Sequence, residues 1–291
     1  MMALLKALWK LRPPGEPENP GARLVRRWRE KRLLARLERE WPGGFVLHRT
    51  GDLVYVPSPL DARGRHALLH PPRVHPAVLG FLQPGFVVID VGASLGEWTV
   101  PLARAVGPSG RVIAVEPAPR SAAALASTLA ANALSQVEII RCALGDHDGT
   151  VEFAVPVVTS ARADTGTARI GPACAGYDAL QVPLSRLDSV SAERKLSRLD
   201  LVKIDVEGHE RSVLDGGADI LERHRPIIVI ETGHEGEADR RAIHGQLQKL
   251  RYRILGILLD FGMAQADWRG YLALDSPFRL GDAHNLLLVP E

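Results

Sequence analysis

The feature that most constrains this chain is a change of pattern at Pro84, after which short β-rich runs alternate with helical stretches. Such alternation predicts βαβ units built around a parallel sheet. The runs are nearly continuous in apolar residues, which indicates strands that helices cover on both faces. The five runs are Phe86 to Val91, Val112 to Glu116, Val137 to Cys142, Leu201 to Asp205 and Ile227 to Glu231.

Helices are expected between these strands, and two further apolar runs are expected to close one edge of a mostly parallel, seven-stranded sheet. The segment 154–182, between the third and fourth strands, is polar and rich in Gly and Thr, and a loop of this length is usually a lid or a binding loop. A plain surface excursion or hairpin is the alternative. The expected helices are Glu97 to Val106, Ser121 to Ala133, Glu210 to Arg223 and Gly236 to Leu250, and the closing runs are Tyr252 to Leu259 and Asn285 to Val289.

The amino-terminal region, residues 1–50, is expected to be a basic helical extension and linker ahead of a main domain over 51–291. Residues 1–40 contain 11 Lys and Arg against 5 Asp and Glu. A first short helix places Leu4, Leu5, Leu8 and Leu11 on one face, so it could lie on a membrane surface, although docking on the domain is the favoured alternative. A linker over 12–21, a second helix over 22–40 and a hairpin around Gly51 and Asp52 complete this region.

The composition excludes several classes of protein. Cys142 and Cys174 lie far apart, with no Cys-x-x-Cys spacing and no His cluster nearby, so neither a disulfide framework nor a zinc site is indicated. The opening apolar run contains Lys6 and Lys10 and is too short and too charged for a signal peptide core or a membrane span. A cytoplasmic protein is the expectation, and the sequence carries no signal for an oligomeric state.

A small-residue turn follows the first strand. Gly92 and Ala93 leave room for a ligand to approach the backbone, and Gly96 permits close helix contact. Ser94 with Glu97 has the spacing of a capping box. The string is VVIDVGASLGEWT, from Val87 to Thr99.

The chemistry of this turn favours one kind of nucleoside. A dinucleotide site needs a second glycine so that the backbone can approach a pyrophosphate, and that place, position 94, is Ser. A phosphate-free nucleoside such as S-adenosylmethionine is therefore the better ligand, with Asp90 near its cationic amine. Glu116 follows the last glycine by about 20 residues, the separation at which an acid binds ribose hydroxyls. Ala143 and Leu144, after the third strand, are expected to border the adenine.

The fourth strand carries most of the reactive side chains. It ends in KIDVEGHE, which brings Asp205, Glu207 and His209 to the edge where open α/β sheets bind ligands. Methyl transfer to a hydroxyl needs the acceptor held in line and relieved of its proton, and these three side chains could share the task. His209 is a candidate base, although a lone His at a helix start more often caps or hydrogen-bonds.

Other polar residues at this edge have weaker roles. Glu231 and His234, after the fifth strand, form a second candidate pair. Lys203, in mid-strand, is expected to be paired or to face an edge, and Glu210 to complement the dipole of the following helix. The spacing of these acids and histidines matches neither His-Glu-x-x-His nor an EF-hand, so no obligatory metal is expected.

These motifs, in this order, resemble the FkbM-type methyltransferase family, whose members use S-adenosylmethionine and mostly act on hydroxyls of sugars or natural products. The resemblance spans about residues 84 to 290 and implies a Rossmann-like class I methyltransferase fold, with Asp90, Gly92, Gly96 and Glu116 on the cofactor and residues 205–210 near the methyl group. The matching strings are IDVGASLGEWT, GRVIAVEPAP, CALGDHDGTVEF, LSRLDS, LDLVKIDVEGHE, VLDGGADIL, PIIVIET and HNLLLVP.

The sequence departs from the family at two positions. Ser94 stands where the family usually has Asn, and both residue types cap helices. Pro101 falls inside the expected first helix, which should therefore start late or bend.

The predicted function is S-adenosylmethionine-dependent O-methylation of a small hydroxylated acceptor, such as a glycan or secondary metabolite. One alternative is a catalytically silent S-adenosylmethionine-binding scaffold or sensor. Another is a nucleic-acid methyltransferase that uses the Arg-rich helix, but the chain lacks a strongly basic overall charge and aromatic interleaving on a basic strand, so no nucleic-acid partner is expected.

Overall fold

The structure is a computed structural model, and it describes residues 39–158, 164–233, 235–259, 262–273 and 284–291, with residues 25, 28, 29, 32, 33, 35 and 36. The expected first helix, with Leu4, Leu5, Leu8 and Leu11, and the linker over 12–21 lie outside the described residues. The described residues between 25 and 40 are helical, as predicted. None of the helices in this part of the chain is long and apolar enough to cross a bilayer.

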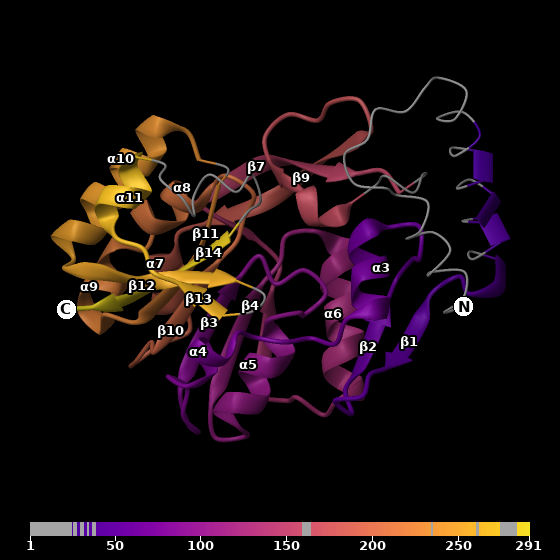
Figure 1. Ribbon diagram of the computed structural model, residues 1–291, viewed down its shortest axis with the longest axis horizontal. Coiled ribbons are helices and arrows are strands. Elements are labelled where there is room, and N and C mark those ends of the chain that lie inside the picture. The colour runs from indigo at the N-terminus through magenta and orange to yellow at the C-terminus, as the bar shows by residue number, and fades with distance from the viewer. Residues whose placement is uncertain are drawn as a thin grey trace.

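The main sheet has the strand order β13-β12-β14-β11-β10-β3-β4-β5 (Figure 1). Its central strands β5, β4, β3, β10 and β11 are parallel, and β14 pairs antiparallel with both β11 and β12. The strands are β3 (Val87–Val91), β4 (Arg111–Val115), β5 (Val137–Ile140), β10 (Leu201–Ile204), β11 (Ile227–Thr232), β12 (Tyr252–Leu259), β13 (Gly262–Ala264) and β14 (His284–Pro290).

Seven of these strands were predicted, and the eighth, β13, corrects that number. It is a three-residue edge strand that follows β12 and pairs antiparallel with it, with Leu258 opposite Met263. Its sequence, Gly-Met-Ala, has neither an apolar run nor an alternating pattern. Pairing with the neighbouring strand, not local sequence, therefore makes it a strand.

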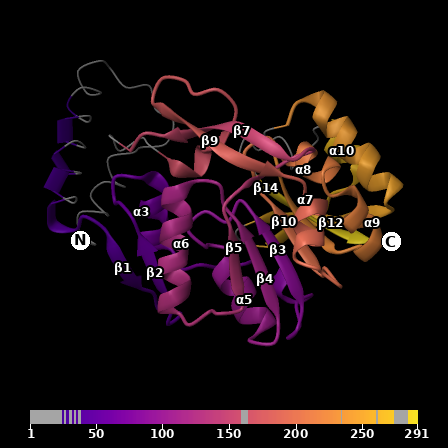
Figure 2. The same ribbon diagram turned by 180° about the vertical axis from the view of Figure 1, so that it is seen from behind.

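Helices cover both faces of the sheet, which Figures 1 and 2 show from opposite sides. Successive residues of β3 point to opposite faces, so Val88 belongs to the core under α4, α5 and α6, and Ile89 to the core under α7 to α11. The first set is α4 (Pro76–Leu79), α5 (Thr99–Val106) and α6 (Pro119–Ala131), and the second is α7 (Leu187–Glu193), α8 (Glu210–Asp215), α9 (Ala218–His224), α10 (Glu237–Lys249) and α11 (Trp268–Ala273).

One helix begins late, near a proline, and another is interrupted where a single helix was expected. Helix α5 starts at Thr99, so Pro101 lies in its first turn, where no backbone donor is lost; the late start was predicted. The single helix expected over 210–223 is two helices, α8 and α9. A Cβ on Gly216 would lie 1.9 Å from the carbonyl oxygen of Gly145, so the chain turns there in close contact with the neighbouring backbone.

The segment 154–182, expected to be a loop, contributes instead to a second sheet of order β6-β9-β7-β8. Strands β7 and β9 pair antiparallel along their whole length, and in both views they lie along one edge of the molecule (Figures 1 and 2). The sequence did not reveal this sheet, because much of β9 is exposed and the strand is therefore not a continuous apolar run. The elements are β6 (Ala143–Leu144), β7 (Gly149–Pro156), the 3-10 helix η1 (Thr165–Thr167), β8 (Arg169–Ile170) and β9 (Tyr177–Ser185).

The predicted hairpin is present as β1 (Gly44–Leu47) and β2 (Leu53–Val56), which spans the domain boundary predicted at residue 50. Strand β2 is fixed to α6 by side-chain bonds: Asn132 accepts from the Leu53 N–H at 3.0 Å, and Thr128 accepts from the Tyr55 N–H at 2.9 Å. The next helix, α3 (Ala62–Leu69), packs against η1. Asp61, which precedes it, accepts the backbone N–H of Thr165 at 2.9 Å.

Candidate active site

A cavity of about 240 Å³ lies at the carboxyl ends of β3, β4 and β10. Strand order reverses between β4 and β10 on either side of β3, and such switch points are where open α/β sheets bind ligands. The second sheet, η1 and α3 form the remaining walls, through Phe153, Gly166, Ile170 and Arg63. The cavity is therefore assembled from segments that are distant in sequence.

The turn after β3 forms the floor of the cavity. Gly92 has φ +83°, and a Cβ placed on it would lie 1.8 Å from the carbonyl oxygen of Asp205, so only glycine fits between the two strand ends. Gly92, Ala93 and Ser94 all line the cavity. The N–H groups of Gly92 and Ala93 donate to the carbonyl of Val115, which holds the turn against β4.

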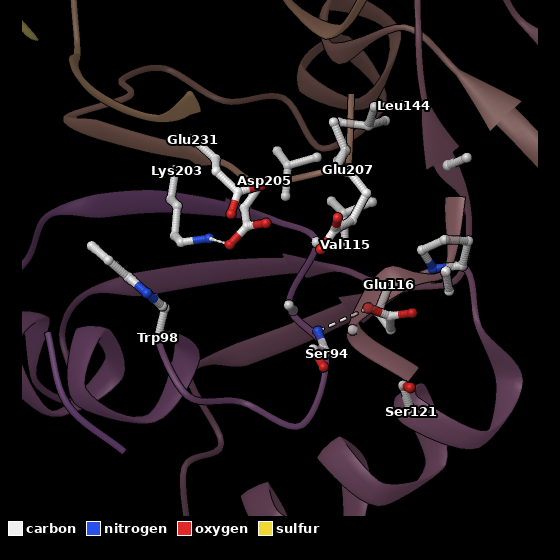
Figure 3. Close-up of a pocket in the computed structure, with 18 of the residues that line it drawn as sticks. Ser94, Trp98, Val115, Glu116, Ser121, Leu144, Lys203, Asp205, Glu207 and Glu231 are labelled. Carbon is white, nitrogen blue, oxygen red and sulfur yellow. Dashed lines mark hydrogen bonds and ion pairs between the residues drawn. The ribbon is translucent and has the colours of Figure 1, made fainter. Parts of the chain in front are cut away.

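Glu116, at the end of β4, faces the cavity and is only 6% exposed. Its Oε2 accepts the Ser94 N–H at 2.8 Å (Figure 3). Its Oε1 accepts the Ala118 N–H at 2.8 Å. Burial raises the pKa of Glu116 to about 7, against the opposing effect of these two backbone bonds. Each carboxylate oxygen retains a lone pair, so Glu116 can still accept hydrogen bonds from a ligand hydroxyl.

An apolar wall stands beside Glu116. Ala143 and Leu144, which are expected to border the adenine, line the cavity from β6, and Cys142 and Phe153 extend this surface. All four side chains are buried. A flat apolar ring of the size of a nucleobase is the ligand group that such a wall suits.

Arg63 and Glu97 form the opposite side. Arg63 Nη1 lies 2.9 Å from Glu97 Oε2, and His66 Nδ1 lies 2.9 Å from Glu97 Oε1. Burial opposes the charge on Glu97, but Arg63 and His66 outweigh it and lower the pKa of Glu97 to about 2. The predicted capping box is therefore wrong: Glu97 pairs with α3, and Ser94 lies five residues before the helix begins.

Three carboxylates meet where β10 and β11 end. Asp205, Glu207 and Glu231 each place an oxygen within 4.8 Å of the others. Lys203, fully buried, lies 2.7 Å from Asp205 Oδ2 and 5.1 Å from the centre of the Trp98 ring. In Figure 3 Asp205 and Glu231 point toward one another, and the Glu207 carboxylate extends into the cavity between them and Glu116.

Charge is distributed unevenly over this cluster. Burial opposes ionisation of Asp205, yet Lys203 outweighs it and keeps the pKa of Asp205 below its ordinary value. Burial by itself would lower the pKa of Lys203, but the charges of Asp205 and Asp90 outweigh it and raise this pKa above its ordinary value. For Glu231, burial and the neighbouring Asp205 and Glu207 act together and raise the pKa to about 9.

Glu207 adopts an unusual backbone conformation, with φ +54°. The loop around it is held by Glu210, the first residue of α8, whose Oε1 accepts the N–H groups of Val206 and Gly208 at 3.2 and 3.1 Å. Non-glycine residues in this region are strained and cluster at functional sites. The strain here directs an acidic side chain into the cavity.

Three predicted site residues do not line the cavity. Asp90 is fully buried and accepts the hydroxyl of Thr99 at 2.6 Å, so it supports the turn from behind. Gly96 instead contacts the core, because a Cβ there would meet Leu125 at 2.8 Å. His209 lies beside Gly145, outside the cavity, where burial lowers the pKa of its ring. His234, the partner suggested for Glu231, is outside the described residues.

Several cavity residues were missed or underrated. Lys203 was expected to be paired or to face an edge, and it is paired with Asp205. A charged residue in an otherwise apolar strand was a signal that could also have placed it in the site. Asn285 and Glu231 face each other on paired strands, which the sequence does not reveal. Arg63 lies in a helix that carried no motif. The expected absence of an obligatory metal stays a prediction, since the three carboxylates also have a spacing that could hold an ion.

Comparison with known proteins gives the site a context. The family described as Methyltransferase FkbM domain matches residues 90–262. Methyltransferase sdnD from Sordaria araneosa is 30% identical over 177 residues, which are 50% of this chain and 65% of that protein. The 31-O-demethyl-FK506 methyltransferase FkbM from Streptomyces tacrolimicus is 32% identical over 162 residues, 47% of this chain and 62% of that protein. The chain thus spans less than two thirds of the length of these relatives.

Solved structures give weaker likenesses. Methyltransferase FkbM from Methylobacillus flagellatus superimposes with a TM-score of 0.45 at 19% identity, over 72% of this chain and 45% of that one. A SAM-dependent O-methyltransferase from Thermotoga maritima gives 0.39 at 15% identity, over 85% of this chain and 77% of that one.

Proposed function

The chain belongs to the FkbM methyltransferase family, and from this membership we propose that it transfers a methyl group to a hydroxyl of a small molecule, sugar or natural product. Its fold is the Rossmann-like class I methyltransferase fold, and S-adenosylmethionine is its cofactor. The O-methyl specificity and the class of acceptor are the proposed part.

The observation that carries the proposal is a single cavity with a ribose-binding acid at one end and a carboxylate cluster at the other. Glu116 would accept the ribose hydroxyls beside the glycine turn, and Ala143, Leu144 and Phe153 would contact the adenine. Gly92 fits this ligand, since its missing side chain leaves the turn flat against the end of β10. Among the described lining residues, acids outnumber Arg63 and Lys203, which suits a cationic ligand.

When bound, S-adenosylmethionine supplies a methyl group on positively charged sulfur. The chain's own residues must then hold an acceptor oxygen in line and take its proton. Asp205 is placed to take this proton, because its side chain is 26% exposed at the cavity and Lys203 holds its Oδ2. Glu207 extends into the same space and would hydrogen-bond the acceptor.

Oxygen is the favoured acceptor atom. The Streptomyces tacrolimicus relative is described as a methyltransferase of 31-O-demethyl-FK506. Carboxylates accept hydrogen bonds, and three of them surround the place where an acceptor would enter, which suits hydroxyl groups.

The free thiols Cys142 and Cys174 fit a reducing compartment, so we also propose a cytoplasmic location.

Two measurements test this function in sequence. Calorimetry with S-adenosylhomocysteine should show binding, and Glu116→Ala should abolish it. Metabolite extracts incubated with the protein and methyl-labelled S-adenosylmethionine should then yield an O-methylated product by mass spectrometry. Binding without transfer to any acceptor would instead indicate a silent cofactor-binding scaffold. A product methylated on nitrogen or carbon would overturn the O-methyl assignment.

A further inference from the structure

Arg63 is a cation in a cavity whose charged lining is mostly acidic. Its side chain comes from α3 and is 29% exposed. Nη1 donates to Glu97 Oε2 at 2.9 Å, and within the part of the chain that the structure describes this is the hydrogen bond that the guanidinium makes. Arginine has five N–H donors and keeps its charge at every physiological pH. Arg63 therefore has donors left for a ligand.

Lys203, the other cation among the described lining residues, is differently placed. Its side chain is only 1% exposed, and Nζ donates to Asp205 Oδ2 at 2.7 Å. An ammonium that is buried and paired in this way is not open to an incoming anion. Arg63 is therefore the lining cation that a negatively charged ligand group can reach.

The backbone donors of the turn after β3 are also occupied. The N–H groups of Gly92 and Ala93 donate to the carbonyl of Val115, and that of Ser94 donates to Glu116. Such a turn can bind an anion only with N–H groups that are free. A negative ligand group beside this turn must therefore find its donors on a side chain.

A carboxylate is the ligand group that suits Arg63. The planar guanidinium matches the two oxygens of a carboxylate, and hydrogen bonds between the two groups are strengthened by charge. The charges of Asp205 and Glu207 face Arg63 across the cavity and repel an anion elsewhere in it. A ligand carboxylate would thus bind at the guanidinium.

We propose that Arg63 binds the carboxylate of a ligand in this cavity, either that of the methionine part of S-adenosylmethionine or that of an acidic acceptor. Both sources offer the same chemistry, which is charge-assisted hydrogen bonding to the guanidinium while Glu97 holds its Nη1. The cofactor source is independent of which atom accepts the methyl group. The acceptor source alone rests on the proposed function.

Gly166 determines where the guanidinium can lie. A Cβ on Gly166 would lie 2.3 Å from Arg63 Nη2 and 2.6 Å from Nε, and Gly166 lines the same cavity. The guanidinium is the flexible end of its side chain, so an added methyl group would displace it and leave the backbone in place. Gly166 thus lets η1 pack against α3 with Arg63 in the cavity.

Calorimetry with two nucleosides tests the cofactor source. S-adenosylhomocysteine carries the carboxylate, and 5′-deoxy-5′-(3-aminopropylthio)adenosine is the same molecule without it. Arg63→Gln should lower the affinity for the first by about 10- to 100-fold, as expected for hydrogen bonds to a charged group, and for the second by less than about 3-fold. Arg63→Lys should retain more affinity, because an ammonium still attracts a carboxylate. Arg223→Gln, which removes an exposed charge on α9, should change neither.

Labelled products test the acceptor source. If Arg63→Gln changes neither affinity, metabolite extracts incubated with methyl-labelled S-adenosylmethionine should yield products that bear a carboxylate, identified by mass spectrometry. The variant should form these products at least about 10-fold more slowly than the wild type. An equal loss of affinity for both nucleosides would show that Arg63 only holds α3 in place, and would overturn the proposal. Unchanged affinities with no loss of carboxylate-bearing product would also overturn it.

Gly166→Ala tests the placement of the guanidinium without removing it. This variant should reproduce the effect of Arg63→Gln from whichever source that effect comes. Gly245→Ala, in α10, is the matched control, since nothing lies within 4 Å of the added carbon. Circular dichroism and thermal unfolding should show both alanine variants folded like the wild type. A folded Gly166→Ala protein with wild-type binding and products would overturn the placement of Arg63.

This inference and the proposed function fail differently. If the product is methylated on nitrogen or carbon, the O-methyl assignment falls, and a selective loss of S-adenosylhomocysteine affinity in Arg63→Gln still supports the carboxylate site. If O-methylation is found but neither binding nor product depends on Arg63, the proposed function stands and this inference falls.

Discussion

Glu116 accepts the backbone N–H of Ser94 at 2.8 Å, and this bond joins the end of β4 to the turn after β3. Ser94 has φ +48°, a conformation that glycine adopts more easily. The buried carboxylate thus stabilises a strained turn and lines the ligand cavity at once. Its protonation state should therefore affect both the fold and the cofactor.

The affinity for S-adenosylhomocysteine should rise as pH increases through about 7, the value to which burial raises the pKa of Glu116. Only the ionised carboxylate accepts from both ribose hydroxyls while it holds its two backbone donors. Calorimetry between pH 6 and 8 in buffers of different ionisation enthalpy should also show proton release on binding, up to about one proton. Glu116→Gln should bind weakly with no such dependence; an unchanged affinity would contradict the assignment.

Glu116 should also make stability depend on pH. Its folded pKa exceeds its ordinary value of 4.5, so the folded state binds the proton more tightly than the unfolded chain does. The stabilising contribution is thus present at low pH and is lost as pH rises from about 4.5 to about 7. The difference in urea unfolding free energy between wild type and Glu116→Gln should follow this change, and a flat difference would refute it.

Gly92→Ala should destabilise the protein by more than about 3 kcal/mol, because the methyl group meets the Asp205 carbonyl and φ is positive. Gly51→Ala is a matched control. Its φ is +88° but nothing lies within 4 Å of the added carbon, so only the conformational cost of about 1 kcal/mol remains. Denaturant unfolding of both variants separates contact from conformation, and equal losses would show that Gly92 is needed only for its φ.

Asp61→Ala should loosen the wall that η1 forms. Asp61 is 1% exposed and accepts both the N–H and the hydroxyl of Thr165, at 2.9 and 2.5 Å. Loss of both bonds should weaken this contact by about 2 kcal/mol, with faster hydrogen exchange over 164–170 and faster release of S-adenosylhomocysteine. Thr165→Val should have about half the effect, and the exposed Thr150→Val none. Unchanged exchange would show that other contacts hold η1.

His209→Gln should keep methyl transfer, since His209 lies outside the cavity beside Gly145. Asp205→Asn should lower the single-turnover rate by about 10²-fold or more, because the proton acceptor is removed. A larger loss in the histidine variant than in the aspartate variant would restore His209 as the base.

Methyl transfer should also survive treatment with EDTA. Loss of activity in EDTA that only added Mg²⁺ reverses would place a metal among the three carboxylates.

The central sheet was predictable because its strands are buried on both faces, so each is an apolar run that sequence alone reveals. Strands β7 and β9 were not, since neither is buried along its whole length and pairing between them decides the structure. The single helix expected over 210–223 missed the break at Gly216 and Gly217, because their close contacts with Gly145 and Leu187 depend on segments that are distant in sequence.

Each motif predicted the site residues of its own segment, but none predicted the residues that distant segments contribute to the site. Gly92, Glu116 and Asp205 follow strands whose carboxyl ends must meet at one edge, so their grouping was predictable. His209 is in the same string as Asp205, but the tight turn through Gly208, with φ +96°, directs it elsewhere. The approach of Arg63 to Glu97 depends on how α3 packs against the turn after β3, which no local pattern encodes.

The match to the family covers residues 90–262, yet Arg63 and Asn285, which lie on either side of that range, both line the cavity. Relatives can therefore share every motif of the matched region and still present different chemistry to an incoming acceptor. Exchange of 57–70 between relatives, with the motifs untouched, would be a direct way to redirect selectivity.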